Sequence, residues 1–388
     1  MRLSMTDIPR FFKVPVGHFF LLGPRGTGKT WWTRRQFPEA LRVDLLDPAT
    51  LRVLAARPER LRELMAARPG LKEVVLDEVQ KLPELLEVVH GLIEERAGPV
   101  RFVLTGSSAR KLRREGVNLL GGRAASHALH PYMAAELGGA FELESALRHG
   151  LLPVVLGSEA PEEQILAYNG VYLREEIQAE GLVRNVGGFA RFMEALSFSH
   201  GSVLNLANVS RECQVSRATL EGYLSILEDL LLAWRVPVFT RRARRQLAGH
   251  PKFYFFDAGV FRANRPHGPL DAASEIDGAA LEGLVAQHLR AWCAYSEGGH
   301  ALHYWQTRSQ LEVDFIIYGE SGLYALEVKN TDRIRPADLT GLKHFAEDYP
   351  EGRRYLLYRG KERVLLEGIL CLPCAEFLRS LTPDGFPA

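Results

Sequence analysis

Short hydrophobic runs recur in the first part of the chain and predict buried strands. His18-Phe19-Phe20-Leu21-Leu22 stops at Gly23, and residues 29 to 37 then continue with a helical pattern. Two more apolar runs, 73–76 and 101–104, are each followed by polar residues. This part of the chain therefore predicts buried parallel strands whose ends carry polar side chains.

The middle of the chain has mainly helical periodicity. Residues 140 to 184 predict helices of mixed charge, and a new pattern begins after them. The pattern predicts helices at 189–199 and 206–213, a helix capped by Ser216, and strands at 234–239 and 252–256. Two short helices, a turn and two strands form the outline of a helix-turn-helix with a wing.

The last part returns to strands after one helix. Apolar residues on one face predict a helix at 278–289, followed by strands at 303–306, 312–317 and 323–329. In the last strand Glu327 and Lys329 point to one side, because side chains alternate along a strand.

Composition places the chain among ordinary globular proteins. Its 388 residues predict two or three domains, and a net charge of +1 means that any affinity for nucleic acid must come from local patches. No apolar run reaches the ~18 residues of a membrane span, and the N-terminus lacks a signal-peptide pattern, so we expect a cytoplasmic location. Four scattered cysteines argue against a disulfide framework, and Cys371 and Cys374 lack the partners of a zinc site.

Gly23-Pro24-Arg25-Gly26-Thr27-Gly28-Lys29-Thr30 is the strongest chemical signal in the sequence. It matches the phosphate-binding loop G-x-x-x-x-G-K-[ST] between a predicted strand and a predicted helix. Gly23, Gly26 and Gly28 would let backbone N–H groups surround the phosphates of ATP. Lys29 would reach the β- and γ-phosphates, and the Thr30 hydroxyl would bind Mg²⁺.

Polar residues after the next strands complete this site. Asp77 would hold Mg²⁺ through water, and Glu78 would act as the general base for the attacking water. Thr105 is a candidate for sensing the γ-phosphate or that water. Arg123 is open to two interpretations: a residue that contacts phosphate, in its own subunit or a neighbour's, or an ordinary surface arginine.

Arginines mark the expected helix-turn-helix and wing. Arg217 lies on the capped helix, and four more arginines lie between the two strands: Arg241, Arg242, Arg244 and Arg245. They suit contacts to DNA phosphates. A spacer or protein-docking module with a solvated arginine-rich tip is the alternative.

Acidic residues near the end of the chain predict a second site. Asp314 and Glu327 are the expected Mg²⁺ ligands, and Lys329 would position or activate a water molecule. Glu282, from the preceding helix, would complete the cluster. Hydrolysis of a phosphodiester needs carboxylates that hold a metal and a positive group near the scissile phosphate. The alternative is a domain that keeps this fold without activity.

Together these motifs resemble AAA+-type ATPases of bacteria and archaea that end in a PD-(D/E)XK nuclease-like domain. The resemblance rests on the phosphate loop, Leu76-Asp77-Glu78, Thr105-Gly106-Ser107-Ser108, Gly121-Gly122-Arg123, His130-Pro131-Tyr132 with Glu136-Leu137, and the C-terminal acidic residues. It implies a doubly wound α/β ATPase core at 1–140, a helical and winged-helix segment at 141–262, and a restriction-endonuclease-like α/β domain at 263–388.

We therefore expect an ATP-dependent DNA-processing enzyme with ATPase activity and Mg²⁺-dependent nuclease activity. Repair, recombination (including branched DNA and Holliday junctions) and defence are the roles that this implies. The main alternative is an ATP-switched DNA-binding or regulatory ATPase with an inert nuclease fold. A scaffold ATPase that acts on protein is a third, and self-association stays open.

Overall fold

The computed structural model describes residues 8–95, 100–108, 120–172, 186–241 and 249–387. Its contacts divide the chain into two compact units. The N-terminal unit consists of the described residues of 12–130 with 226–231, and the C-terminal unit contains the rest of the described chain. The segments that the sequence analysis separates at residue 262 thus lie in one compact unit.

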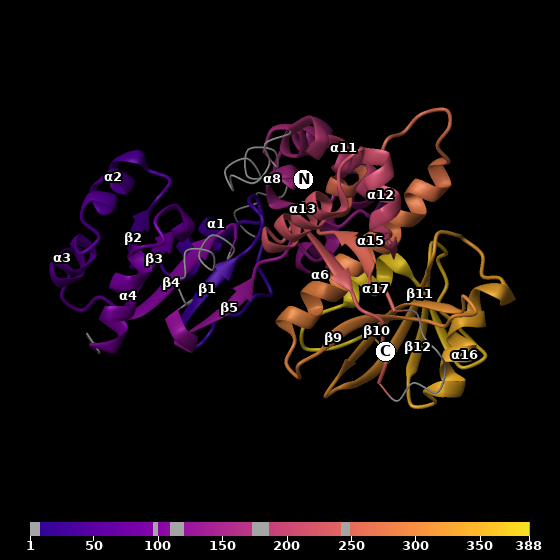
Figure 1. Cartoon of the computed structure of the whole chain (residues 1–388). Coiled ribbons are helices and arrows are strands. Elements are labelled where there is room, and N and C mark those ends of the chain that lie inside the picture. Colours follow the sequence, from indigo (N-terminus) through magenta and orange to yellow (C-terminus); the bar gives the residue numbers. More distant parts are fainter. Residues whose placement is uncertain (1–7, 96–99, 109–119, 173–185, 242–248, 388) are drawn as a thin grey trace. The chain divides into compact units, whose positions relative to one another are not determined.

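The N-terminal unit is built on a five-stranded parallel sheet in the order β2-β3-β4-β1-β5 (Figure 1). Its elements are β1 (His18–Leu22), α1 (Lys29–Gln36), β2 (Leu41–Asp44), α2 (Pro48–Ala56), α3 (Arg60–Ala66), β3 (Glu73–Asp77), η1 (Val79–Lys81), α4 (Leu85–Glu94), β4 (Arg101–Gly106), η2 (Leu120–Gly122) and β5 (Ala124–Ala128).

Strand order decides which loops meet in this unit. β4 lies between β1 and β3, so the residues after these three strands emerge side by side at the carboxyl edge of the sheet. The strands are buried because helices cover them, and Phe20, Leu76 and Leu104 belong to one hydrophobic core. The predicted strands and the helix after Gly28 are confirmed.

The C-terminal unit begins with helices and a small sheet, except that residues 226–229 of these helices belong to the N-terminal unit. These elements are α6 (Ala134–Leu137), η3 (Gly138–Ala140), α7 (Leu143–His149), α8 (Pro153–Leu156), α9 (Pro161–Ala167), η4 (Tyr168–Tyr172), α11 (Val186–Ser197), β6 (Ser202–Val203), α12 (Leu206–Cys213), α13 (Arg217–Asp229), β7 (Ala233–Val236), β8 (Lys252–Phe255) and α14 (Ala258–Asn264).

The three short strands form an antiparallel sheet in the order β6-β8-β7. The backbone N–H of Thr219 donates to Ser216 Oγ at 3.3 Å, so the predicted cap of α13 is confirmed. Phe189 and Phe192 of α11 pack against Tyr223 of α13. Aromatic packing therefore joins two of the helices that precede β7.

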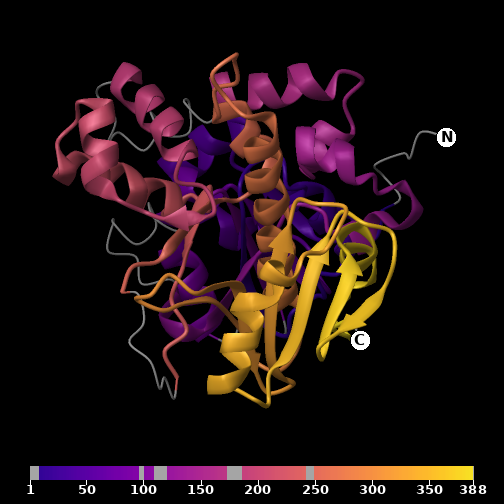
Figure 2. The same ribbon diagram turned by 90° about the vertical axis from the view of Figure 1, so that its right-hand side faces the viewer.

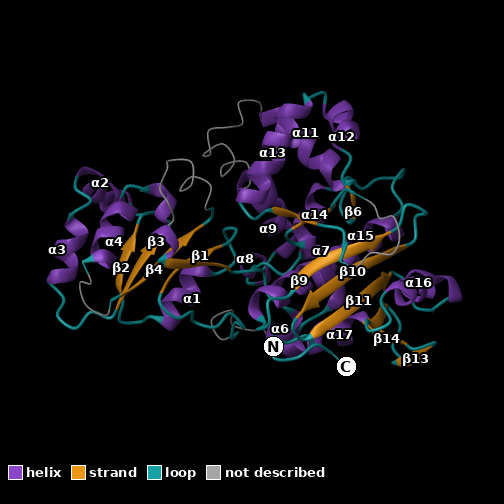
Figure 3. Cartoon of the chain, turned by 60° about the horizontal axis from the view of Figure 1, so that its bottom comes forward, coloured by secondary structure: helices purple, strands orange, loops and turns teal. Residues whose placement is uncertain are grey.

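A six-stranded mixed sheet follows, in the order β13-β14-β12-β11-β10-β9 (Figure 3). Its elements are α15 (Ala273–Tyr295), β9 (Ala301–Gln306), β10 (Glu312–Gly319), β11 (Gly322–Lys329), η5 (Pro336–Leu339), α16 (Thr340–Asp348), β12 (Arg353–Tyr358), β13 (Val364–Leu366), β14 (Ile369–Pro373) and α17 (Cys374–Ser380). Figure 2 shows the long α15 beside this sheet, where it contacts β9 and β11.

Register on this sheet brings acidic positions together. β10 and β11 are antiparallel with Phe315 opposite Leu326, which sets Asp314 next to the end of β11 that carries Glu327. A register shift between Val313 and Ile316 marks a bulge in β10 at this point. Bulges redirect side chains, and they are common near functional sites.

Among the described residues, no helix is both long enough and apolar enough to span a bilayer. The four cysteines are free thiols, and Cys371 in β14 and Cys374 at the start of α17 are both buried.

Candidate functional site

The phosphate loop is held closely against the sheet. Gly23 N donates to the carbonyl oxygen of Gly106 at 3.3 Å, and a Cβ at Gly23 would lie only 2.6 Å from the carbonyl oxygen of Leu129. Gly26 and Gly28 have φ of 75° and 91°, a conformation that favours glycine. Lys29 begins α1, and its Nζ donates to the carbonyl oxygens of Gly23 at 2.6 Å and Pro24 at 3.2 Å. The lysine is thus held over its own loop.

A hydroxyl and a carboxylate meet beside this loop. Thr30 Oγ1 donates to Asp77 Oδ2 at 2.8 Å, and the Thr105 hydroxyl bonds to the other oxygen of Asp77. Asp77 is 7% exposed. A threonine hydroxyl next to a carboxylate at the start of a helix is a donor set that suits Mg²⁺, so these residues fit the expected metal. The position of β4 explains why Thr105 reaches Asp77.

Glu78 directly follows Asp77 in a left-handed backbone conformation, with φ of 60°. Such a conformation is costly for a residue other than glycine, and it persists mostly at functional sites. Gln80 Nε2 donates to Glu78 Oε2 at 2.6 Å and to Ser107 Oγ at 2.9 Å. Gln80 thereby fixes the Glu78 carboxylate. The sequence analysis missed this glutamine, although it lies only two residues after Glu78.

Arg123 lies at the other edge of the same sheet. It precedes β5, whose first residue Ala124 is in register with His18 at the start of β1, whereas the phosphate loop follows the end of β1. One strand length of about 16 Å separates these edges. The Arg123 guanidinium forms an ion pair with Glu94. Contact with the phosphate of its own subunit is therefore ruled out in this arrangement, and a neighbour's phosphate or a surface role stays open.

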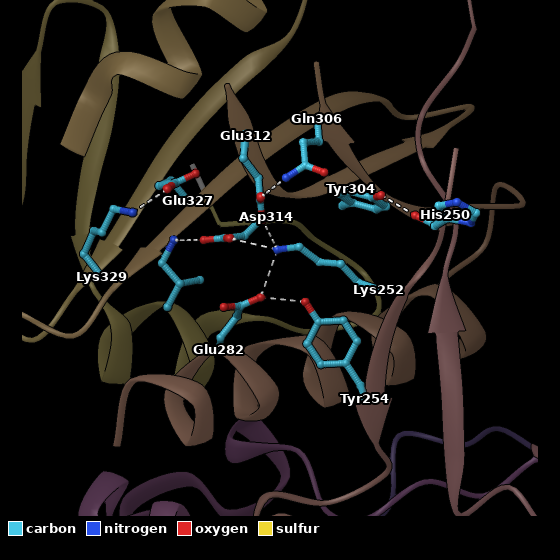
Figure 4. A network of polar contacts seen from close by, with 11 residues as sticks. His250, Lys252, Tyr254, Glu282, Tyr304, Gln306, Glu312, Asp314, Glu327 and Lys329 are labelled. Atoms are coloured by element: carbon cyan, nitrogen blue, oxygen red, sulfur yellow. Dashed lines mark hydrogen bonds and ion pairs between the residues drawn. The ribbon is translucent and has the colours of Figure 1, made fainter. Parts of the chain in front are cut away.

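The C-terminal unit brings a lysine into the middle of its acidic residues (Figure 4). Lys252 Nζ lies 3.2 Å from Glu282 Oε1 and 3.2 Å from Asp314 Oδ1, and it also forms an ion pair with Glu312. We refer to Glu282, Glu312, Asp314 and Glu327 as the acidic cluster. The Lys252 side chain is only 2% exposed, so the carboxylates take the place of water around its ammonium group.

Each of the three carboxylates around Lys252 also accepts a hydrogen bond from a different element. Tyr254 OH donates to Glu282 at 2.6 Å, Gln306 Nε2 donates to Glu312 at 2.6 Å, and Val328 N donates to Asp314 at 2.9 Å. Partners of this kind fix the orientation of ligand-type side chains.

Glu327 pairs with Lys329 instead of Lys252. Lys329 Nζ lies 2.6 Å from Glu327 Oε1, so the two side chains share one side of β11 as predicted. The other carboxylate oxygen of Glu327 is buried and has no hydrogen-bond partner among the described residues. Burial and the nearby Asp314 carboxylate raise the pKa of Glu327 to about 8, although Lys329 opposes this shift.

Burial also acts on Glu282 and Lys252. Burial raises the pKa of Glu282 to about 7, against the lowering effect of Lys252. Burial alone would lower the pKa of Lys252, but Glu282, Asp314 and Glu312 raise it well above its ordinary value. The surrounding carboxylates therefore stabilise the charged form of Lys252.

Mg²⁺ does not fit the acidic cluster in this arrangement. Within the described ranges, no three His, Cys, Asp or Glu side chains are placed to hold a metal ion. The expectation that Asp314 and Glu327 hold Mg²⁺ therefore stays a prediction, and in this arrangement the Lys252 ammonium group lies beside Asp314. Two features of the sequence could have indicated the contact between Lys252 and the carboxylates. They are the lysine at the start of the apolar run Lys252–Phe256, and Glu312 two residues before Asp314.

The candidate DNA-contacting arginines are only partly described. Arg217 is exposed and forms an ion pair with Glu221 at 2.9 Å. Arg241 is exposed, and its guanidinium lies over the Tyr318 ring at 4.7 Å from the ring centre. Arg242, Arg244 and Arg245 lie outside the described residues.

Comparison with known proteins divides the chain into three segments. Residues 17–138 match the family described as an AAA domain, and residues 141–269 and 277–377 match two families that are each described as a domain of unknown function. Proteins of Mycobacterium tuberculosis and Mycobacterium bovis, both described as uncharacterized, are 26% identical to this chain over 377 residues. The match covers 94% of this chain and 81% of each relative.

Two solved structures align with this chain at lower sequence identity than the mycobacterial relatives. A Walker-type ATPase of Pyrococcus abyssi aligns with a TM-score of 0.44 and 12% identity, over 63% of this chain and 90% of that one. The ORC1 protein of Aeropyrum pernix, solved in complex with DNA, aligns with a TM-score of 0.27 and 16% identity, over 65% of this chain and 87% of that one.

The AAA domain match and the parallel sheet agree: the N-terminal part of the chain is an AAA-type P-loop ATPase domain.

Proposed function

We propose that the chain binds ATP with Mg²⁺ and hydrolyses it at the carboxyl edge of the parallel sheet. The observation that carries this proposal is the meeting of Thr30, Asp77 and Thr105 beside the phosphate loop, with Glu78 directly after them. These residues come from three segments that are distant in the sequence. If the acidic residues after β3 belonged to an ordinary solvated loop, Thr30, Asp77 and Thr105 would have no reason to meet beside the phosphate loop.

Each residue has one task in this proposal. Lys29 leaves the carbonyl oxygens of its loop to contact the terminal phosphates, and Glu78, oriented by Gln80, accepts the proton of the attacking water. Thr105 holds Asp77 in place. Mg²⁺ bound at Thr30 and Asp77 would neutralise charge on the phosphates.

Two substitutions test this assignment. Lys29→Ala should reduce ATP hydrolysis by about 10²-fold or more, because it removes the loop cation that stabilises charge on the phosphates. Glu78→Gln should keep ATP binding and lose most of the turnover, because the amide keeps the shape but accepts no proton. Phosphate release and binding of a fluorescent ATP analogue measure the two effects. Undiminished turnover of Lys29→Ala would refute the ATPase assignment.

We also propose that the protein is an ATP-switched DNA-binding protein rather than an active nuclease. The order α11, β6, α12, α13, β7, β8 with the sheet β6-β8-β7 agrees with the element order expected of a winged helix. The segment between β7 and β8 carries the four arginines. This supports DNA contact by the part that the sequence analysis places at 141–262.

The C-terminal part supports a PD-(D/E)XK-like fold without metal-dependent cleavage. Glu282, Asp314, Glu327 and Lys329 lie on a helix and two adjacent strands in the expected order, which favours the fold. Lys252 among the carboxylates favours the inert alternative over the nuclease.

A further inference from the structure

The acidic cluster contains a cation that belongs to the chain itself. Lys252 reaches it from β8, which pairs with β6 and β7, while its carboxylate partners come from α15 and β10. A buried ammonium group that lacked partners would cost several kcal/mol, so this lysine is stable only because the carboxylates surround it. We propose that Glu282, Glu312 and Asp314 form a cation site whose resident cation is the Lys252 ammonium, and that a divalent metal binds there only when this ammonium is removed.

The spacing of the oxygens supports an ammonium group as the occupant. Glu282 Oε1 and Asp314 Oδ1 both lie 3.2 Å from Lys252 Nζ, which is a hydrogen-bond distance. Mg²⁺ requires oxygens at about 2.1 Å, so the carboxylates would have to move inward by about 1 Å. This distance explains why a site with so many carboxylates does not present a ready metal site.

Charge supports a latent metal site. One ammonium faces three carboxylates in this group, so its formal charge is −2. A divalent ion in the place of Lys252 would leave a formal charge of −1. In addition, the second oxygen of Glu327 has no hydrogen-bond partner within the part of the chain that the structure describes, and the Glu327 side chain is only 9% exposed. Glu327 also interacts electrostatically with Asp314, so its carboxyl group adjoins the cation site.

Space for movement of Lys252 exists on one side. A cavity of about 800 Å³ is lined by Lys252 and Glu312 together with residues of the β6–β8 region and of the loop between β9 and β10, such as Ser202, His250 and Arg308. A lysine that borders a cavity has room to leave the carboxylates, so the site can change occupant without unfolding of the sheet.

The test measures Mn²⁺ binding to the full chain without nucleotide, by calorimetry and by the Mn²⁺ electron paramagnetic resonance signal. Five proteins are compared: wild type, Asp314→Asn, Lys252→Met, Lys252→Met with Asp314→Asn, and Lys343→Met. Lys343 is a partly exposed lysine that pairs with Glu367, so its substitution controls for loss of a positive charge elsewhere. Because ATP is absent, the outcome does not depend on the proposed ATPase function.

We expect wild type and Lys343→Met to bind no Mn²⁺ in an Asp314-dependent manner up to about 1 mM. Lys252→Met should gain one site that is at least about tenfold tighter, and the added Asp314→Asn should remove it. In parallel, wild type should cut no linear or branched DNA with Mg²⁺ or Mn²⁺, with or without ATP.

Two results would overturn the proposal. The first is Mn²⁺ binding or DNA cleavage by wild type that Asp314→Asn abolishes, because Lys252 would then fail to exclude the metal. The second is a folded Lys252→Met protein, as judged by circular dichroism, that binds no Mn²⁺. If Lys252→Met does not fold, Lys252→Met with Glu282→Gln lowers the uncompensated charge and takes its place, and the wild-type measurements remain decisive by themselves.

Discussion

Two aspartates cap helices in this protein, and their surroundings make them opposite in their response to pH. Asp257 at the start of α14 is fully buried and accepts hydrogen bonds from the backbone N–H groups of Leu151, Gly259 and Val260. Burial raises its pKa from 3.8 to about 6 in spite of these bonds. Asp47 at the start of α2 is exposed, and hydrogen bonds from Thr50 and Ala49 lower its pKa. An aspartate at the start of a helix can therefore have a raised or a lowered pKa, depending on its burial.

Substitution of Asp257 and Asp47 by asparagine should separate the effect of burial from the effect of hydrogen bonding on stability. The raised pKa of Asp257 contributes stability that is present at low pH and lost as pH rises through about 6, on the order of 2–3 kcal/mol at most. The destabilisation by Asp257→Asn should therefore be larger at pH 4.5 than at pH 7.5. Asp47→Asn should destabilise about equally at both pH values, because the stability that comes from a lowered pKa is fully present above the ordinary value of 3.8 and is lost only below it. Urea unfolding at both pH values measures this, and parallel trends would contradict the burial argument.

At the scale of elements, close packing of α16 on the sheet supports the acidic cluster. A Cβ at Gly341 in α16 would lie 1.9 Å from the carbonyl oxygen of Glu312 in β10. Leu342 and Phe345 of the same helix belong to the core with Trp305 and Val313. The helix therefore fixes the backbone from which Glu312 and Asp314 project.

Gly341→Ala should destabilise the protein by about 1–3 kcal/mol, because backbone atoms cannot give way to the new methyl group. Gly222→Ala in α13 is the matched control, since a Cβ there meets nothing within 4 Å. Alanine is the better helix former, so Gly222→Ala should be neutral or stabilise by up to about 1 kcal/mol. Thermal unfolding of the two variants measures the contrast. Equal melting temperatures for Gly341→Ala and wild type would show that α16 does not pack as closely as described.

At the scale of the whole molecule, the chain combines an AAA-type domain with a region that we propose to be a winged helix. The formal net charge is only +1, so non-specific attraction by overall charge is weak. DNA binding then depends on a local patch, and the arginines between β7 and β8 are the strongest concentration of positive charge in that region.

Replacement of Arg241, Arg242, Arg244 and Arg245 by serine should weaken DNA binding and flatten its dependence on salt. Each phosphate contact contributes about 0.9 to the slope of log K against log salt, so loss of four contacts lowers the slope by up to about 3.6. Fluorescence anisotropy with labelled duplex at several salt concentrations measures the slope, and the exposed pair Arg57 and Arg68 replaced by serine is the control. An unchanged slope would place the DNA surface elsewhere.

Local patterns were sufficient to predict the secondary structure around both sites. The strand before Gly23, the helix from Lys29, the cap at Ser216 and the strand with Glu327 and Lys329 all depend on short-range features, and the structure confirms them. Periodicity and capping act over a few residues, so one sequence contains them in full.

Tertiary structure decided what surrounds each functional side chain. Strand order set Thr105 beside Asp77 and moved Arg123 to the far edge of the sheet, and neither result follows from distance along the chain. The contact between Lys252 and Asp314 joins residues that are 62 positions apart, across two sheets and a helix. The sequence determined which residues carry charge and on which elements they lie. Only the packing of those elements placed the Lys252 ammonium group among the carboxylates, because burial and the distances between charges exist only in the folded chain.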